Sequence, residues 1–295
     1  MAQAHAPEAD TYYVPHSSPW PIYGSVSLFV LMLGAASTLN NWLPAWSLVP
    51  GFVMLVLMFI FWFGTVISEN EHGMYNMAVD RSFRMGMMWF IFSEVMFFAA
   101  FFGALFYARE LAVPWLSGHG VKIFNNLLLW KDYGGSWPTN GPSTLGPRAD
   151  GTFEVVSPIG LPAVNTAILL TSSITVTIAH HALIAGHRAR LKIFLALTFL
   201  LGFTFVFLQA KEYHEAYTEL GLQLGTGIYG STFFLLTGFH GFHVTLGAIM
   251  LTVIWFRVMK GQFTPQRHFA FEAVAWYWHF VDVVWLGLFI FVYWL

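Results

Sequence analysis

Long apolar runs alternate with short polar segments along almost the whole chain of 295 residues. The hydrocarbon core of a bilayer is about 30 Å thick, so about 20 consecutive apolar residues can cross it as a helix. By that criterion the pattern predicts an all-α membrane protein with about seven transmembrane helices. The expected ranges are 22–39, 47–67, 85–107, 161–183, 193–209, 228–256 and 269–295.

The last apolar run, from Phe269 to the C-terminus, carries Glu272, His279 and Asp282 in its first half. At about 100° per residue these three side chains fall on one arc of a helix. A charge near the bilayer centre costs on the order of 2.5–3.5 kcal/mol or more. The arc must therefore face protein, water or a lipid headgroup, and the helix needs at least one packing partner.

Two other runs also carry ionisable residues. Glu94 lies about nine residues into its predicted helix, where a carboxyl must carry a proton or have a hydrogen-bonding partner. It could form a proton-linked or lipid-headgroup site, or be a neutral helix-packing residue. His240 and His243 share a helix face and could bind a metal. Hydrogen bonding across helices is the favoured interpretation, because two neighbouring glycines, Gly238 and Gly241, are typical of close helix packing.

The polar segments predict the topology. Lys and Arg in short loops favour the cytoplasmic side, and here they gather on one side, at Arg81, Arg84, Arg188, Arg190, Lys192, Arg257, Lys260 and Arg267. The N-terminus is then cytoplasmic and the C-terminus outside, with a long outer loop at about 109–158. A second outer loop is expected to hold Glu212, Glu215 and Glu219. The expected parts are an N-terminal segment at 1–20, a first pair of helices at 21–72 and a larger bundle at 73–295.

Composition supports the membrane assignment and excludes other classes of function. Only 9% of residues are charged, 57% are hydrophobic and the mean hydropathy is +0.62, whereas soluble domains have about 25% charged residues. The absence of cysteine excludes disulfides, thiolate metal sites and cysteine nucleophiles. A net charge of −2 gives no case for nucleic-acid binding. The N-terminal segment has no basic residue before the first apolar run, so we expect no signal peptide.

Several polar residues lie at helix ends or in the N-terminal segment. His180 and His181 point about 100° apart at a helix end, where we expect them to be solvated and unable to share a metal. Arg257 and Lys260, one turn apart, could bind a lipid phosphate or act only as a positive-inside anchor. His5 and His16 could exchange protons near neutral pH.

Five runs together resemble the helix motifs of cytochrome c oxidase subunit III. They are FIFSEVMFFAAFF, TVTIAHHALIAGHR, LQAKEYHEA, YGSTFFLLTGFHGFHV and FEAVAWYWHFVDVVWL, and they cover the third to seventh predicted helices. The resemblance implies a two-helix bundle and a five-helix bundle, separated by a V-shaped cleft that holds phospholipid. It implies a non-catalytic subunit without haem or copper, in a proton-pumping complex that reduces oxygen to water.

The resemblance also implies partners and a location. The chain would dock directly on subunit I, which holds the haem and copper, within a complex that includes subunit II, with a small subunit IV as a further candidate partner. Cytochrome c would be the substrate of the complex. The chain would support proton uptake and protect the complex against inactivation during turnover. The expected location is the plasma membrane of a bacterium.

Site residues are carried over by position, and none is assigned to catalysis or to a metal. The lipid site would comprise Trp62, Phe90, Glu94, Arg257, Lys260, Gln262 and His268. A proton antenna would comprise His5 and His16, and structural polar residues would be His240, His243, Glu272, His279 and Asp282. Animal members have histidine where this chain has Gln262, and their outer loop is shorter.

Three alternatives remain open. A related quinol oxidase has a similar third subunit, although the last-helix motif fits the cytochrome c branch better. A proton or ion transporter could use Glu94 with the acids of the last helix, which would require a continuous polar path through one bundle. A haem-bearing subunit could use His240, His243 and His279, and would show a Soret band as an isolated chain.

Overall fold

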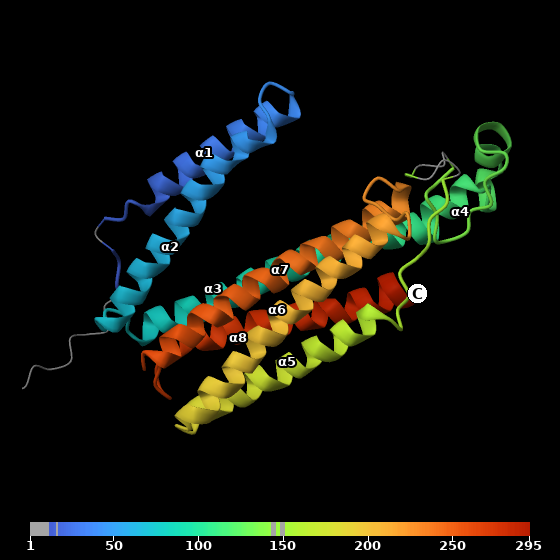
Figure 1. Cartoon of the computed structure of the whole chain (residues 1–295). Coiled ribbons are helices and arrows are strands. Elements are labelled where there is room, and N and C mark those ends of the chain that lie inside the picture. The colour runs from blue at the N-terminus through green and yellow to red at the C-terminus, as the bar shows by residue number, and fades with distance from the viewer. Residues whose placement is uncertain (1–11, 16, 143–145, 148–150) are drawn as a thin grey trace, which may run out of the picture. The chain divides into compact units, whose positions relative to one another are not determined.

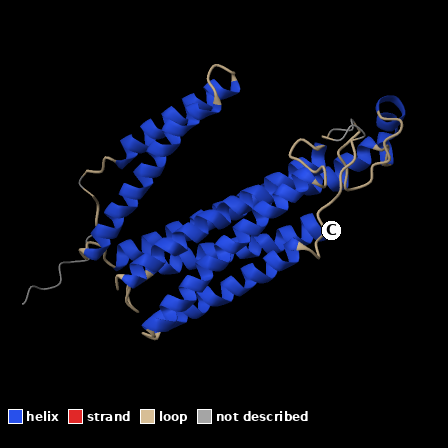
Figure 2. Cartoon of the chain, viewed as in Figure 1, coloured by secondary structure: helices blue, strands red, loops and turns tan. Residues whose placement is uncertain are grey.

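The computed structural model describes residues 12–15, 17–142, 146–147 and 151–295. These residues form helices and connecting loops, with no β-strand among them (Figure 2). Seven of the helices in the described part are long and apolar enough to cross a membrane. The predicted all-α membrane protein with about seven transmembrane helices is therefore confirmed.

The spanning helices follow the predicted order but differ in length. Their bounds are α1 (Trp20–Leu39), α2 (Val49–Glu71), α3 (Met77–Phe106), α5 (Leu161–Ile184), α6 (Arg188–Thr218), α7 (Gly227–Met259) and α8 (Phe269–Leu288). The apolar run of α6 stops before Lys211, yet the helix continues past it for two turns. The prediction that Glu212 and Glu215 lie in a loop is thus wrong, because a helix can end well beyond its apolar stretch when its last turns find packing partners.

The chain divides into two compact units, residues 1–85 and 86–295. In the first unit, α1 and α2 are joined by a 3₁₀ turn at Ala45–Leu48 and cross at two glycines. A Cβ on Gly34 would collide with the Ser47 carbonyl, and one on Gly51 would collide with the Leu31 backbone. The Ser47 hydroxyl also donates to the Gly34 carbonyl at 3.1 Å. Small residues thus bring these two backbones together, as is typical of membrane helices.

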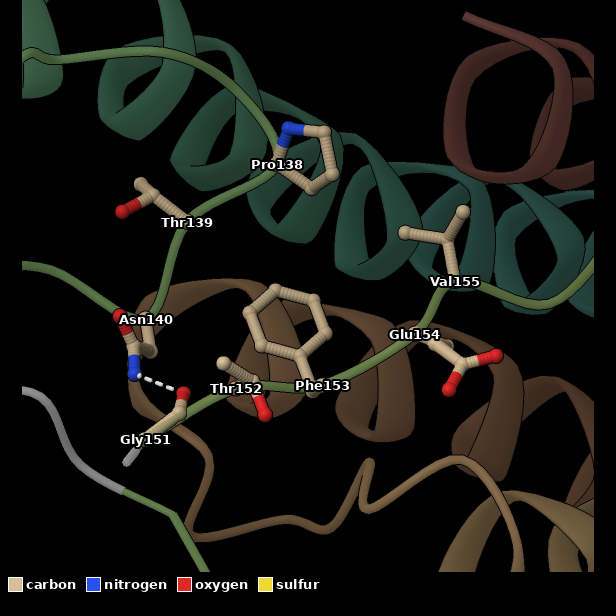
Figure 3. Close-up of a pocket in the computed structure, with 8 residues that line it drawn as sticks. All are labelled: Pro138, Thr139, Asn140, Gly151, Thr152, Phe153, Glu154 and Val155. Atoms are coloured by element: carbon tan, nitrogen blue, oxygen red, sulfur yellow. Dashed lines mark hydrogen bonds between the residues drawn. The ribbon is translucent and has the colours of Figure 1, made fainter. Parts of the chain in front are cut away.

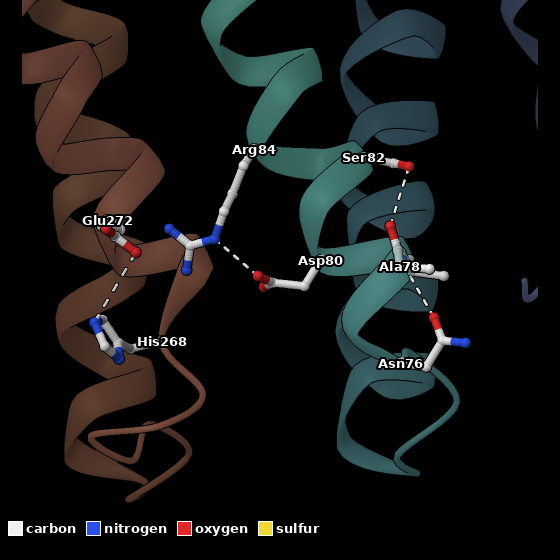
Figure 4. A network of polar contacts seen from close by, with 8 residues as sticks. Asn76, Ala78, Asp80, Ser82, Arg84, His268 and Glu272 are labelled. Carbon is white, nitrogen blue, oxygen red and sulfur yellow. Dashed lines mark hydrogen bonds and ion pairs between the residues drawn. The ribbon is translucent and has the colours of Figure 1, made fainter. Parts of the chain in front are cut away.

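Local polar contacts hold the connection from α2 to α3. Tyr75 donates a 2.6 Å hydrogen bond to Glu69 near the end of α2. Burial and this carboxylate raise the pKa of Tyr75. The Asn76 side chain accepts the Val79 amide at 3.0 Å, which satisfies a donor at the start of α3 (Figure 4). These contacts fix where α2 ends and α3 begins.

In the second unit, α5, α6, α7 and α8 run beside one another (Figure 1). Two fully buried tryptophans of α8 lie at the centre. The indole nitrogen of Trp278 donates to the Ser172 hydroxyl, and that of Trp285 donates to the Thr166 hydroxyl, both at 2.9 Å. A buried indole without an acceptor would be costly inside a membrane. These two bonds therefore fix α8 against α5.

Two glycines of neighbouring helices also make close contacts with Trp278. A Cβ on Gly202 of α6 would lie 2.6 Å from the Trp278 ring, and one on Gly247 of α7 would lie 2.8 Å from it. Gly241 has no atom within 4 Å of the same position, and Gly238 has only an ordinary contact with Tyr213. The prediction of close packing at Gly238 and Gly241 is wrong, because the large ring that needs space lies further along α7.

The region expected as a plain outer loop contains short helices. The helix α3 continues through a π-helical turn at Tyr107–Ala112 into α4 (Val113–Leu116), and a 3₁₀ turn at Gly120–Lys122 and a π-helical turn at Asn125–Leu129 follow. Further along, the Glu154 amide donates to the Leu220 carbonyl at 2.9 Å, and the Tyr229 amide donates to the Thr139 carbonyl at 3.2 Å. This region therefore lies at the end of the bundle where α6 connects to α7.

Candidate functional site

A hydrogen bond between Glu94 of α3 and His243 of α7 forms the centre of the candidate site. The distance between Glu94 Oε2 and His243 Nε2 is 2.8 Å. The imidazole is buried, and the Glu94 side chain retains 21% exposure. The other ring nitrogen, His243 Nδ1, lies 2.6 Å from the Phe239 carbonyl one turn earlier on α7. Both ring nitrogens are thus engaged.

These contacts fix the number of protons in the pair. A carbonyl only accepts, so His243 Nδ1 must carry a proton and donate to Phe239. The bond between Nε2 and Glu94 contains one more proton, because neither a carboxylate nor an unprotonated nitrogen can donate. The pair is either a carboxylic acid beside a neutral imidazole or a carboxylate beside an imidazolium. In both forms its total charge is zero, which suits a medium of low dielectric constant.

Aromatic rings surround the pair and supply that medium. The Phe98 ring lies 5.1 Å from the His243 ring, edge on, and Tyr277 stacks on it at 6.4 Å. Three further rings lie within about the same distance, those of Phe97, Phe242 and Phe280. A proton can be held by such a pair or shifted between its two members. A metal cation would find a single carboxylate, that of Glu94, as an anionic ligand in the pair. The arrangement therefore suits proton sharing and helix pairing.

The arc of α8 that was predicted to avoid lipid faces α5. His279 Nε2 lies 3.3 Å from the Thr177 hydroxyl of α5. Asp282 is buried close to Ser173, also on α5, although neither Asp282 Oδ1 nor Ser173 Oγ has a hydrogen-bond partner. Glu272 lies one turn after His268, with 4.0 Å between the His268 Nε2 and Glu272 Oε2 atoms (Figure 4). The expected packing partner of this helix is thus α5, and protein covers the ionisable arc.

The three histidines considered for a haem site point to separate partners. His240 Nε2 lies 3.1 Å from the Val281 carbonyl of α8, whereas His243 contacts Glu94 and His279 contacts Thr177. Among the described residues, no group of three or more His, Asp or Glu side chains is arranged to hold a metal ion. Each of these histidines instead joins its helix to a neighbour.

His180 differs from the expectation of a solvated histidine. Its ring packs against Phe271 at 5.5 Å, and its Nε2 atom is buried. The adjacent His181 is exposed, as expected. The difference arises because α8 covers the face of α5 on which His180 lies. The sequence of α5 alone does not indicate which helix packs against that face.

The two basic residues proposed for a phosphate differ in environment. Arg257 is only 8% exposed, donates from Nε to Gln262 Oε1 at 2.8 Å and lies 4.6 Å from the centre of the Phe263 ring. Lys260 is exposed at the end of α7. Arg257 follows His243 by 14 residues, or about 21 Å along a helix. The structure therefore does not bring Arg257 and Lys260 to the depth of Glu94.

The remaining predicted site residues lie in several places. Phe90 is exposed and stacks on Tyr277 with 6.2 Å between ring centres, and His268 Nδ1 lies 3.2 Å from the Thr264 carbonyl. Trp62 belongs to the first unit, where it is exposed and stacks on Phe59. His5 and His16 lie outside the described residues. The lipid and antenna roles of all these residues stay predictions.

Sequence reasoning missed a second buried polar cluster, centred on Glu212. This carboxyl is 2% exposed, and its Oε1 atom accepts hydrogen bonds from Tyr293 at 2.7 Å and Gln209 at 3.0 Å. Asn165 of α5 contacts Gln209 at 3.5 Å. The run KEYHEAYTE around Glu212 has the composition of a solvated loop. A four-residue spacing of Lys211 with Glu215, which form an ion pair at 3.5 Å, was the available sign that the helix continues.

A shallow pocket of about 590 Å³ lies in the region between α4 and α5. Figure 3 shows two loop segments, 138–140 and 151–155, that line it. The Asn140 side chain bridges them by donating to the Gly151 carbonyl at 2.8 Å. Glu154 is the charged residue among its lining side chains. The pocket contains none of the predicted site residues.

Comparison with known proteins agrees with the resemblance seen in the helix motifs. The family model for cytochrome c oxidase subunit III matches residues 10–128 and 132–295. Cytochrome c oxidase subunit 3 of Tetraodon nigroviridis is 41% identical over 293 residues, which cover 98% of each chain. The same-named proteins of Danio rerio and Coturnix japonica are 41% and 39% identical, with the same coverage. Together with the seven spanning helices, these matches show that the chain belongs to the cytochrome c oxidase subunit III family.

Proposed function

We propose that this chain is a non-catalytic subunit of a proton-pumping cytochrome c oxidase, in which it stabilises the haem-copper subunit I. The observation that carries the proposal is the engagement of the intramembrane ionisable groups with neighbouring helices: Glu94 with His243, His240 with the Val281 carbonyl and His279 with Thr177. Side chains used in this way suit a component of an assembly. In this proposal haem and copper belong to partner subunits.

We further propose that the subunit binds phospholipid. An exposed Lys260 at the end of α7 is available to an anionic headgroup, and such a cation contributes about 1 kcal/mol near a membrane surface. The hydrogen bond between Arg257 and Gln262 would stabilise the end of α7 at which Lys260 lies. The acyl chains would then extend toward the depth of Glu94 and Phe90. In this proposal Lys260 binds the lipid headgroup, and the acyl chains lie near Phe90.

The proposed orientation places the α5–α6 and α7–α8 connections on the cytoplasmic side of a bacterial plasma membrane. Arg188 of the first connection donates a 2.6 Å hydrogen bond to the Phe263 carbonyl of the second, so the basic residues of both lie at one end. That distribution agrees with the positive-inside rule. Histidines at the same end, including His187 and His268, would support proton uptake there. The region at 109–158 would contact another subunit on the opposite face.

Isolation of the native assembly through a tag on this chain tests the proposal. Intact-mass analysis is expected to show subunits I and II with the chain, together with retained phospholipid, and spectra of the assembly are expected to show haem. Oxidation assays with reduced cytochrome c and with a quinol then distinguish the two oxidase branches. A chain recovered alone would contradict the proposal. So would a Soret band, or proton flux in vesicles, from the isolated chain.

A further inference from the structure

Polar side chains follow one another along the contact between α5 and α8. From the connection end of the bundle inward, α8 and its N-terminal cap contribute His268, Glu272, His279 and Asp282, and α5 contributes His180, Thr177 and Ser173. We call this set the α5–α8 seam. Its members lie along one side of each helix, and none of them belongs to the Glu94–His243 site.

The outer part of the seam is formed by close imidazoles and one carboxylate. The rings of His180 and His268 lie 5.4 Å apart, and His268 Nε2 is 4.0 Å from Glu272 Oε2 (Figure 4). One turn deeper, the Thr177 hydroxyl and His279 Nε2 are 3.3 Å apart. His279 is half-buried, so this level retains some access from outside the chain.

The inner part of the seam ends at a buried acid. Asp282 is 7% exposed and lies close to Ser173 and His279. The titratable neighbour of Asp282 on α8 is His279. His268, Glu272, His181 and His279 lie around His180, nearer the connection end. The helix α7, which also packs against α8, contributes His240, whose Nε2 lies against the carbonyl of Val281 beside Asp282.

Unsatisfied polar atoms concentrate in the seam. In the described part of the chain, six buried side-chain nitrogen or oxygen atoms lack a hydrogen-bond partner, and three of them are His180 Nε2, Ser173 Oγ and Asp282 Oδ1. Buried polar groups that find no protein partner are commonly satisfied by internal water, which forms about three hydrogen bonds. Ser173 and His180 are seven residues apart on α5, which leaves a length of about 10 Å to be bridged.

Beyond Asp282 the contact between the two helices becomes apolar. Leu169, one turn further along α5 from Ser173, is fully buried, as is Trp285, one turn beyond Asp282 on α8. The next polar contact is the direct bond from the Trp285 indole to Thr166, which satisfies both partners without water. The seam therefore has an entrance at the connection end and no continuation to the other end.

From this geometry we propose that the α5–α8 seam is a blind, hydrated inlet that holds a file of water molecules and an exchangeable proton on Asp282. Water molecules would donate hydrogen bonds to Asp282 Oδ1 and Ser173 Oγ and form a hydrogen bond with His180 Nε2. Each of the three unsatisfied atoms would then have a hydrogen-bond partner. The proton would enter from the connection end and return by the same way. The inlet is a proton store beside the bundle, and it is separate from the lipid and docking roles proposed above.

Cysteine substitution tests the water file, because the chain itself contains no cysteine. Ser173→Cys and Leu169→Cys would be introduced singly into the assembled complex and treated with a small charged thiol reagent, with modification read from the mass of this chain. Because the thiolate is the reacting species and needs water, Ser173→Cys is expected to react at least about tenfold faster than Leu169→Cys. In sealed vesicles of one orientation, the reaction should occur from the connection side. Equal rates at the two positions would overturn the water file.

Infrared spectroscopy of the same complex tests the proton. The wild-type spectrum minus that of Asp282→Asn is expected to contain a protonated-carboxyl band that shifts in heavy water and is lost on alkalinisation. A Glu94→Gln complex should retain this band, which separates it from the other buried acid. If Asp282→Asn does not assemble, Asp282→Glu should instead shift the band. Absence of any band that depends on position 282, or a band that does not exchange in heavy water, would overturn the assignment.

Discussion

Glu94 and His243 are 149 residues apart in the sequence, and Glu94 Oε2 lies 2.8 Å from His243 Nε2. Aromatic rings surround the two side chains. The contact is a polar bond between α3 and α7, and phenylalanine rings of the two helices also pack against each other. Its charge neutrality explains how a carboxyl and an imidazole share a site of low dielectric constant.

Replacement of Glu94 by glutamine should preserve the contact, because the amide can donate to His243 Nε2. We expect Glu94→Gln to assemble with a modest loss of activity and altered lipid retention. Glu94→Ala leaves the buried imidazole nitrogen without a partner, which should cost about 1–3 kcal/mol of stability. Denaturant titration of the purified complex compares the two variants. Equal stability of Glu94→Gln and Glu94→Ala would show that the bond is unimportant, and complete loss of electron transfer in an intact Glu94→Gln complex would contradict the accessory role.

The glycines that contact Trp278 should tolerate no side chain. An added methyl group in a filled core typically costs about 1–3 kcal/mol, so Gly202→Ala and Gly247→Ala should both lower the unfolding midpoint. Gly241→Ala is the matched control on α7, because its new Cβ meets no atom within 4 Å. It should have wild-type stability or slightly more. Similar losses from Gly241→Ala and Gly247→Ala would argue against the Trp278 contact.

The basic residues at the end of α7 should separate into two roles. Lys260→Ala should reduce retained anionic phospholipid while leaving the unfolding midpoint unchanged, since Lys260 is exposed. Arg257→Ala should lower the midpoint, because it removes a buried side chain with contacts to Gln262 and Phe263. Lipid mass spectrometry and thermal unfolding on the same preparations measure both effects. The reverse pattern, with Lys260→Ala unstable and Arg257→Ala depleted of lipid alone, would refute this division.

The cluster around Glu212 should anchor the end of the chain. Tyr293→Phe removes the hydrogen bond of 2.7 Å to Glu212 and should cost about 0.5–1.5 kcal/mol locally. Hydrogen exchange in residues 289–295 should accelerate, because these residues form the π-helical end of α8. Tyr107→Phe, at an exposed tyrosine, serves as the control. Unchanged exchange in Tyr293→Phe would mean that packing alone holds this segment.

Hydropathy predicted the spanning helices because a bilayer requires a minimum length of apolar chain. It also showed that Glu94 and the arc of α8 needed partners. It did not identify those partners, since His243 and Ser173 are far from them in sequence and many registers satisfy the same pattern. Glu212 was missed for the opposite reason, because a charged stretch at a helix end has the composition of a loop. Gly202 was missed because its role depends on one tryptophan of another helix.

The crossing of α1 and α2 has a consequence for how the protein is made. Its glycine contacts, Gly34 with Ser47 and Gly51 with Leu31, join residues close in the sequence. Contacts of such short range form quickly and require no later part of the chain. The hairpin can therefore close in the membrane while the remaining helices are still being synthesised. Biogenesis would then begin with a folded pair of helices, and the bundle around Trp278 and Trp285 would fold later, after its helices have been synthesised.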